Sequence, residues 1–292
     1  MAGFVQLLIS GLATGAIYAL AAIGFTLLWQ TSQTINFAQG EFVMVPAFFV
    51  LAAMRFLDLG FWPAMLFGLV VSLVLLGAVF KLVLVDPMLK HGVLPLVIAT
   101  IALAIFIKEW VKNHYTGEAQ RFPSMVPDVI WRWGGAAISS YDILVLVVAV
   151  AAVVALQLFL TRTLTGRSMQ ATAQNRAVAI VLGINVERMI LLTFLLNAAL
   201  VFLASVLISP IYLAKFDNGE TLGLVAFTAA IVGGFNQVRG AIAGGFIIGL
   251  ADNLTAAYVS TQYRTAVPLL LLVAIILFRP QGLLGRAEER TV

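Results

Sequence analysis

Long apolar runs alternate with short polar stretches along the whole chain. Most of these runs approach or exceed the length of about 20 residues that a helix needs to cross a bilayer. The pattern predicts an all-α, polytopic membrane protein with about eight to ten transmembrane helices, some of them broken or re-entrant. The predicted apolar segments are Phe4–Trp29, Val43–Leu57, Phe61–Val85, Val93–Trp110, Ile143–Leu160, Met189–Leu213, Leu222–Phe235, Ala241–Tyr258 and Thr265–Phe278.

A polar stretch, Thr163–Arg188, separates two of these runs. It carries Arg167, Arg176 and Arg188 against one acid, Glu187. Its apolar positions recur every three to four residues, which is the spacing of a short amphipathic helix. These positions are Met169, Ala173, Val178, Val181 and Leu182.

Gly183 is expected to end this helix, because glycine readily adopts the backbone conformation that follows a helix. A short basic helix between two spans is well placed to contact a cytoplasmic partner. The alternative is an ordinary solvated loop that its arginines retain on the inner side.

Lysine and arginine also predict the orientation of the spans. Alternating ends place Lys81–Lys90, Arg162–Arg188, Arg239 and the tail with Arg279, Arg286 and Arg290 on one side, which we take as cytoplasmic. The C-terminus is therefore expected inside. Nine crossings would place the N-terminus outside, and a re-entrant segment would change that count.

The stretch Gln30–Phe42 is polar and contains glycine, yet it bears a single charge, Glu41. It is predicted to be non-helical backbone at membrane depth, where protein or a water-filled cavity must surround it, with a turn at the membrane interface as the alternative. Asn36, Gln39 and Glu41 are then candidates for lining a polar path. Gln33 and Asn197 are weaker ones. Glu41 could instead simply begin a helix, where the helix dipole favours an acid.

Asp252 is the second acid that falls inside an apolar run. A charge in the bilayer costs about 2.5–3.5 kcal/mol on insertion scales, so such a residue usually faces a cavity or a partner. The alternative is a hydrogen bond to a neighbouring helix. Close helix packing is favoured by the glycines that precede Asp252 and by the small residues Gly11, Gly15 and Ala19, which repeat every four positions. The other interpretation of the glycines is a broken helix beside a substrate path.

Composition narrows the function classes. The chain is 62% hydrophobic and 10% charged, whereas a soluble domain is typically about 25% charged. It has no cysteine and only two histidines, His91 and His114, so a metal site or a cysteine or histidine catalytic centre is not expected. No Gly-Lys dipeptide occurs, which excludes the common phosphate-binding loop. The net charge is +4, and the basic residues lie between the apolar segments and do not form one patch. This pattern does not predict nucleic-acid binding.

Four motifs resemble the LivH-type branched-chain amino acid ABC transporter permeases. INFAQGEFVM is similar to the family's N-F-A-x-G-E/D signature, and LFRPQGLLG to its F-R-P-x-G-L-x-G ending. RSMQATAQNRAVAIVLGIN resembles the family's coupling segment, and AFTAAIVGGFNQVRGAIAGG its glycine-rich stretch. The four motifs occur in the family's order, and the resemblance covers nearly the whole chain.

The resemblance implies a single permease domain over residues 1–292 in the bacterial inner membrane, not an enzyme. Its expected partners are a second, LivM-type permease, two cytoplasmic ATPase subunits and a periplasmic binding protein. The partners would bind ATP, and this chain would need no cofactor. The implied ATPase-coupling residues are Arg167, Arg176, Leu182 and Gly183. The path residues remain Asn36, Gln39, Glu41 and Asp252.

The implied activity is ATP-driven import of branched-chain amino acids or related small amino acids and amides. A member of the same family specific for urea, amides or another small solute is one alternative. An ion-coupled secondary transporter that uses Glu41 or Asp252 is another. A structural membrane subunit with no transport path is the third.

Overall fold

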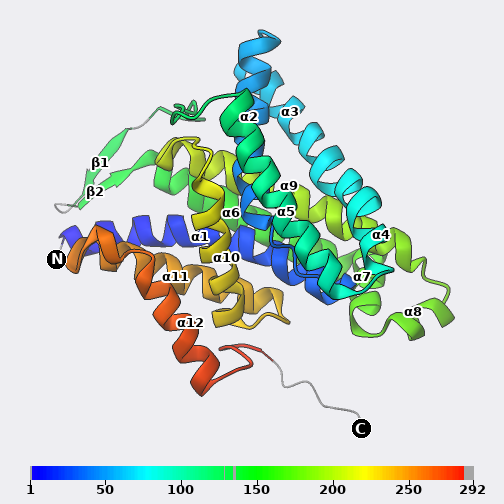
Figure 1. Ribbon diagram of the computed structural model, residues 1–292. Helices are drawn as coiled ribbons and strands as arrows, with labels where there is room; N and C mark the ends of the chain where they lie inside the picture. The colour runs from blue at the N-terminus through cyan, green and yellow to red at the C-terminus, as the bar shows by residue number, and fades with distance from the viewer. Residues whose placement is uncertain (1, 128, 134–135, 286–292) are drawn as a thin grey trace. The chain divides into compact units, whose positions relative to one another are not determined.

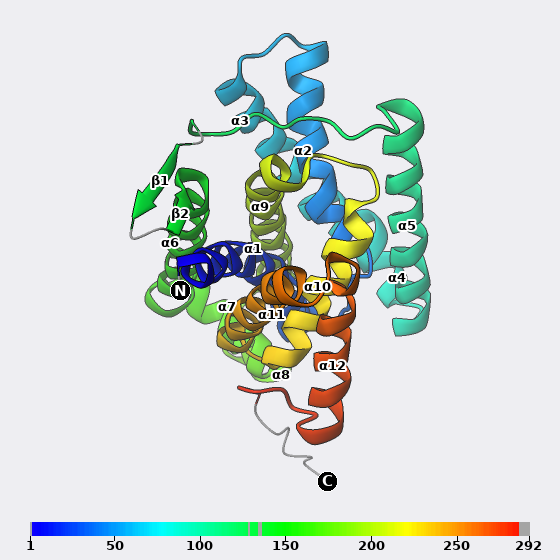
Figure 2. The ribbon, with the colours of Figure 1, turned by 90° about the vertical axis from the view of Figure 1, so that its left-hand side faces the viewer.

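The computed structural model describes residues 2–127, 129–133 and 136–285 and is almost entirely helical (Figures 1 and 2). The predicted residues Arg286 and Arg290 of the basic tail lie outside the described part. The elements are α1 (Ala2–Ser32), α2 (Gln39–Phe56), α3 (Phe61–Ser72), η1 (Leu73–Val85), α4 (Asp86–Leu89), α5 (Val93–His114), β1 (Ile130–Trp133), β2 (Ala136–Ser139), α6 (Ser140–Arg162), α7 (Leu164–Gln174), α8 (Arg176–Val181), α9 (Val186–Tyr212), α10 (Asn218–Gly233), α11 (Val238–Tyr258), η2 (Thr261–Tyr263) and α12 (Ala266–Phe278).

Each predicted apolar segment lies on a helix. Within the described residues, seven helices are long and apolar enough to cross a membrane. The helices α10, with 16 residues, and α12, with 13, are shorter. The candidate spans are Gly3–Ser32, Gln39–Phe56, Phe61–Leu89, Val93–His114, Ser140–Arg162, Val186–Tyr212 and Val238–Tyr258. The prediction of an all-α, polytopic membrane protein is therefore confirmed.

The chain divides into two compact units. The first comprises Met1–Thr26, Ser124–Ala149 and Leu224–Val292, and the second comprises Leu27–Pro123 and Val150–Gly223. Three helices, α1, α6 and α10, pass from one unit to the other along the chain. We describe each unit by itself.

Close contact between α1 and α11 holds the first unit together. A Cβ atom on Gly15 would lie 2.9 Å from the carbonyl oxygen of Gly245, and a Cβ on Gly245 would lie 2.5 Å from Cα of Ala19. The backbones can approach this closely because the contact residues are small. Helix α11 is continuous through its glycines, so the structure agrees with the packing interpretation and not with a helix broken at this point.

The first unit also contains a short hairpin that periodicity did not predict. Strands β1 and β2 pair antiparallel, with Trp131 opposite Ile138, immediately before α6 (Figure 2). The region lies between two predicted apolar segments, Val93–Trp110 and Ile143–Leu160, and no element was expected in it. The two strands are four residues each, which is too short for alternation to stand out from a loop.

The core of the second unit lies between α2, η1 and α9. Phe42 and Phe80 meet edge to face at 4.8 Å between ring centroids, and Phe80 lies 5.8 Å from Phe194. The amide of Ala47, which follows Pro46 in α2, donates a hydrogen bond of 3.0 Å to Oγ of Ser205 in α9. Polar contacts of this kind between helices are common in membrane proteins, where apolar burial alone does not select helix partners.

The span Phe61–Leu89 changes helix type along its length. It is α-helical to Ser72, π-helical over the 13 residues of η1, and α-helical again in α4. Stretches of π-helix are rare and occur frequently at functional sites.

Candidate functional site

The predicted path residues Asn36 and Gln39 are buried at the start of α2, in the second unit. Nε2 of Gln39 donates to Oδ1 of Asn197 at 2.7 Å, and Nδ2 of Asn197 donates back to Oε1 of Gln39 at 3.1 Å. Nδ2 of Asn36 lies 3.4 Å from the same Oε1, and Oδ1 of Asn36 accepts from the amide of Ala38. The structure thus joins Asn36, Gln39 and Asn197 in one buried amide cluster, whereas Gln33 is exposed.

Glu41 lies in the first turn of α2, as its helix-start interpretation predicts, and it is buried. A side chain built on Gly219, at the start of α10, would collide with the carboxylate of Glu41. Oε2 of Glu41 finds no hydrogen-bond partner among the described residues. A buried, incompletely bonded carboxyl group is unusual and calls for an explanation.

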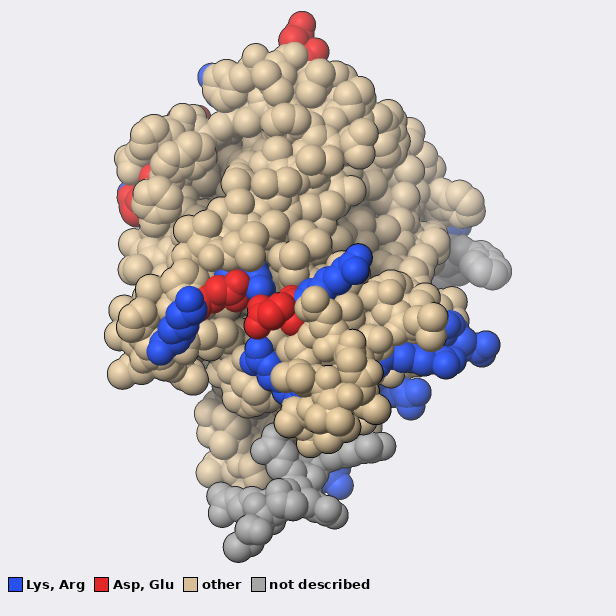
Figure 3. Space-filling view, turned by 90° about the vertical axis from the view of Figure 1, so that its right-hand side faces the viewer, with Lys and Arg blue, Asp and Glu red and all other residues tan. Residues whose placement is uncertain are grey.

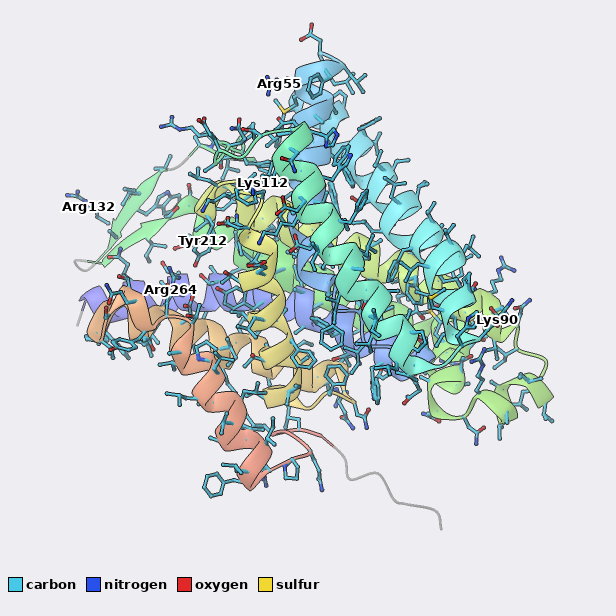
Figure 4. All side chains as sticks on the ribbon, viewed as in Figure 1. Arg55, Lys90, Lys112, Arg132, Tyr212 and Arg264 are labelled. Atoms are coloured by element: carbon cyan, nitrogen blue, oxygen red, sulfur yellow. The ribbon has the colours of Figure 1, made fainter. Side chains whose placement is uncertain are left out.

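Asp252 belongs to the first unit and carries a salt bridge. Nε of Arg264 donates to Oδ1 at 2.8 Å and Nη2 donates to Oδ2 at 2.9 Å, while Tyr18 Oη donates to Oδ2 at 3.3 Å. Arg264, labelled in Figure 4, follows η2 beyond the end of α11. This bidentate pair agrees with the interpretation of Asp252 as a hydrogen-bonding residue between helices. A role of Asp252 in a path stays a prediction.

The predicted coupling segment, 163–188, forms two helices and not one. Helix α7 ends at Gln174, and Asn175 is extended, with φ −156° and ψ 104°. Oδ1 of Asn175 accepts from the amide of Val178 at 3.0 Å, so this residue caps a second helix, α8. Asparagine competes with the helical backbone in this way, which is why apolar spacing alone overlooked the break.

Polar side chains cap every helix start in the segment. Oγ1 of Thr163 accepts from the amide of Gly166 at the start of α7, and Oδ1 of Asn185 accepts from the amide of Arg188 at the start of α9, both at 3.0 Å. Caps of this kind satisfy amides that a helix leaves free at its first turn. The segment is therefore well-ordered structure and not an irregular loop.

Gly183 ends α8 as predicted. Its φ is +78°, its amide donates to the carbonyl of Ile180, and the amide of Ile184 donates to the carbonyl of Ala179. These two bonds form a Schellman motif, which needs a left-handed residue at the position of Gly183.

Helix α8 belongs to none of the candidate spans, and it exposes apolar side chains. The exposed fractions are 59% for Ile180, 85% for Val181 and 69% for Leu182. Arg167 in α7 is also exposed, and its Nε donates to the carbonyl of Thr161. The predicted apolar face is thus divided: Met169 is buried against this chain, whereas Val178, Val181 and Leu182 are exposed.

An ion-pair cluster lies beside this segment, and sequence reasoning missed it. Nζ of Lys81 lies 2.8 Å from Oδ2 of Asp86 and 3.1 Å from Oε2 of Glu187, and Nη2 of Arg176 lies 3.3 Å from Oε1 of Glu187. Basic and acidic side chains alternate in a band on the face in Figure 3. The signal in the sequence was Lys81, a single lysine inside an apolar run. A charged residue in such a run usually pairs with a buried partner.

Among the residues that the structure describes, no group of three or more His, Asp or Glu side chains could hold a metal ion. The predicted coupling residues and the amide cluster with Glu41 lie in the second unit, and Asp252 lies in the first.

Comparison with known proteins finds relatives that are named as branched-chain amino acid transport permeases. The chain is 33% identical to the high-affinity branched-chain amino acid transport system permease protein LivH of Escherichia coli K12, over 99% of this chain and 98% of that protein. It is 32% identical to the permease protein BraD of Pseudomonas aeruginosa, with the same coverage. The structure of PsaBC from Streptococcus pneumoniae in complex with Fab shares the fold, with a TM-score of 0.53 and 14% identity over 95% of this chain and 92% of that one.

Residues 7–276 match the family described as branched-chain amino acid transport system / permease component. This match covers nearly the whole chain and agrees with the all-α membrane fold. It also places the chain among transport components and not among enzymes. The chain belongs to the branched-chain amino acid transport system permease family.

Proposed function

We propose that this chain is the membrane-spanning permease subunit of an ABC importer in the bacterial inner membrane. Its substrates are branched-chain amino acids, and ATP hydrolysis in two cytoplasmic partner subunits drives their transport. A periplasmic binding protein delivers the substrate, and a second, LivM-type permease completes the pathway. The family match and the names of the relatives support this proposal.

The exposed apolar surface of α8 is the observation that carries the proposal. Exposed apolar residues on the spans can face lipid, but α8 lies between the span that ends at Arg162 and the span that begins at Val186. An exposed apolar patch off the spans indicates a protein partner. We assign Ile180, Val181 and Leu182 as the surface that an ATPase subunit covers.

Charge supports a cytoplasmic partner at the same place. Arg162, Arg167 and Arg188 are exposed around α7 and α8, and positive residues accumulate on the inner side of a membrane protein. The caps at Thr163, Asn175 and Asn185 give the segment a defined shape to present. In this proposal ATP binds the partners, and this chain needs no cofactor.

Transport by alternating access would rearrange the helices of the single permease domain, residues 1–292, around a central path. We propose Asn36, Gln39, Glu41 and Asp252 as path residues, although the contacts of Asp252 favour a positioning role. Buried polar side chains in spans commonly mark a substrate route.

A charge introduced into the α8 surface tests the proposal. With the ATPase and second permease coexpressed, Val181→Asp and Leu182→Asp should reduce ATPase copurification at least tenfold while membrane insertion stays normal. The matched control is Val259→Asp, because Val259 is 68% exposed and lies at the end of α11 that we expect on the outer side. Normal copurification in both α8 variants would overturn the assignment.

Substrate and energy source need their own measurement. Uptake into vesicles should require ATP and should be competed by leucine, isoleucine and valine more than by urea or acetamide. Preferential competition by urea or acetamide would instead indicate the alternative substrate class.

One observation favours ion-coupled transport as a second candidate: the buried Oε2 of Glu41 has no hydrogen-bond partner in the described part of the chain. Glu41→Gln removes the titratable group and keeps the shape. ATP-dependent uptake that persists in this variant would exclude ion coupling through Glu41. Uptake that an ion gradient drives without ATP in the unaltered protein, and that Glu41→Gln abolishes, would favour the second candidate.

A further inference from the structure

Lys81 is a buried cation in an otherwise apolar helix. It lies in the π-helical part of the span Phe61–Leu89, within the run LVLLGAVFKLVLV, and is 3% exposed. Burial of a lysine inside an apolar segment is unfavourable unless acids compensate its charge. Asp86 lies one helical turn beyond it and supplies the first acid, at 2.8 Å.

Glu187 supplies the second acid and also links Lys81 to α8. Its two oxygens serve different cations: Oε2 pairs with Lys81 at 3.1 Å, and Oε1 with Arg176 at 3.3 Å. Glu187 stands at the start of α9 and is 68% exposed on its side chain, whereas Arg176 begins α8. The order Asp86, Lys81, Glu187, Arg176 alternates in charge and joins four elements, α4, η1, α9 and α8.

Helix α8 meets its neighbours through non-helical residues at both ends. Asn175 is extended between α7 and α8, and Gly183 is left-handed between α8 and α9. Such positions are where a short helix can change direction, because they absorb changes in backbone angles. A side-chain link between α8 and the adjacent span therefore restricts the orientation of α8.

We propose that Glu187 is a positioning residue, which fixes α8 to the π-helical part of the neighbouring span through Arg176 on one side and Lys81 on the other. This inference rests on the proposed function of α8 as the ATPase-docking surface. In that role the link carries movement of the docked helix directly to η1, in addition to the covalent route through α9.

The first test uses the purified permease alone and does not depend on an ATPase. The chain contains no cysteine, so two can be introduced for spin labels, Val181→Cys on α8 and Val74→Cys at the start of η1. The distance distribution between the labels should be narrow, and Glu187→Gln should broaden it at least twofold. The matched control Glu109→Gln removes an acid from an exposed pair with Lys112 on α5 and should leave the distribution unchanged.

The second test uses the complete transporter and measures substrate transported per ATP hydrolysed. Glu187→Gln and Lys81→Met should retain ATPase copurification and lower this ratio at least threefold. A merely structural role would reduce the yield of complex and leave the ratio unchanged. An unbroadened distribution, or an unchanged ratio in assembled complex, overturns the inference.

An exchange of the charges of Arg176 and Glu187 tests whether Lys81 belongs to the link. Arg176→Glu combined with Glu187→Arg should not restore the narrow distribution, because the exchange rebuilds only the pair between α8 and α9, whereas the new arginine faces Lys81 and the link to η1 is lost. Rescue by the exchange alone would contradict the link to Lys81. If no ATPase copurifies even with the unaltered chain, the proposed function fails, and the label distances still decide whether Glu187 positions α8.

Discussion

The reciprocal amide pair between Gln39 and Asn197 permits a test that separates a structural from a transport role. The two side chains exchange hydrogen bonds of 2.7 and 3.1 Å, and both are fully buried. Leucine at either position keeps similar volume but leaves the partner amide without these bonds. Leucine at both positions removes the two polar groups together.

The expected magnitudes follow from these two bonds. A buried polar group without its partner costs about 1–3 kcal/mol, and removal of both partners is nearly neutral. Hydrogen bonds between membrane helices average about 0.6 kcal/mol in double-mutant cycles, with values up to about 1.7. We therefore expect about 2 kcal/mol of destabilisation for Gln39→Leu or Asn197→Leu, about 1 kcal/mol for the double variant, and hence a coupling energy of about 3 kcal/mol, the sum of the two single effects minus the double effect.

Denaturant titration of the purified permease in mixed micelles measures the free energy of unfolding. The chain contains five tryptophans whose fluorescence can report the transition. Uptake measured on the same variants separates the roles. If the pair is structural, the double variant regains both stability and uptake; if Gln39 lines the path, stability returns and uptake does not.

Thr193→Val is the matched control. Thr193 lies one turn before Asn197 in α9, is fully buried, and donates to the carbonyl of Met189 in its own helix. Its effect should therefore add to that of Gln39→Leu. Additive destabilisation by Gln39→Leu and Asn197→Leu, equal to this control, would refute the reasoning from the pair.

Three further predictions follow from single contacts. Gly245→Val should destabilise the protein by about 1–3 kcal/mol through overpacking against Ala19, seen as a lower unfolding midpoint, and an unchanged midpoint would contradict the packing of α1 on α11. Asp252→Asn should cost about 3 kcal/mol because Arg264 loses its carboxylate, and Glu in its place should recover part of this stability; equal stability of all three proteins in denaturant titration would exclude the pair. Gly183→Pro should leave membrane insertion intact and reduce ATPase copurification, because proline cannot adopt a φ of +78°, and normal copurification would show that the end of α8 is not critical.

Local properties of the chain determined much of the fold. The spans follow from the length and apolar character of each segment, since transfer into the bilayer depends mainly on the segment itself. The end of α8 at Gly183 and the small contact face at Gly15 could be predicted for the same reason, because each depends on the residue's own backbone or size. The break at Asn175 was missed because apolar spacing does not register a side chain that caps a new helix.

Only the tertiary structure determined which polar side chains meet. Lys81 and Glu187 are 106 residues apart in sequence, and Gln39 and Asn197 are 158 apart. The sequence could mark Asn36, Gln39, Glu41 and Asp252 as polar residues in apolar surroundings. It could not say that Asp252 pairs with an arginine, or that one oxygen of Glu41 has no partner within the described residues. A hydrogen bond forms within about 3 Å and in one direction, so it depends on how helices from distant parts of the chain pack, and no residue pattern within one segment contains that information.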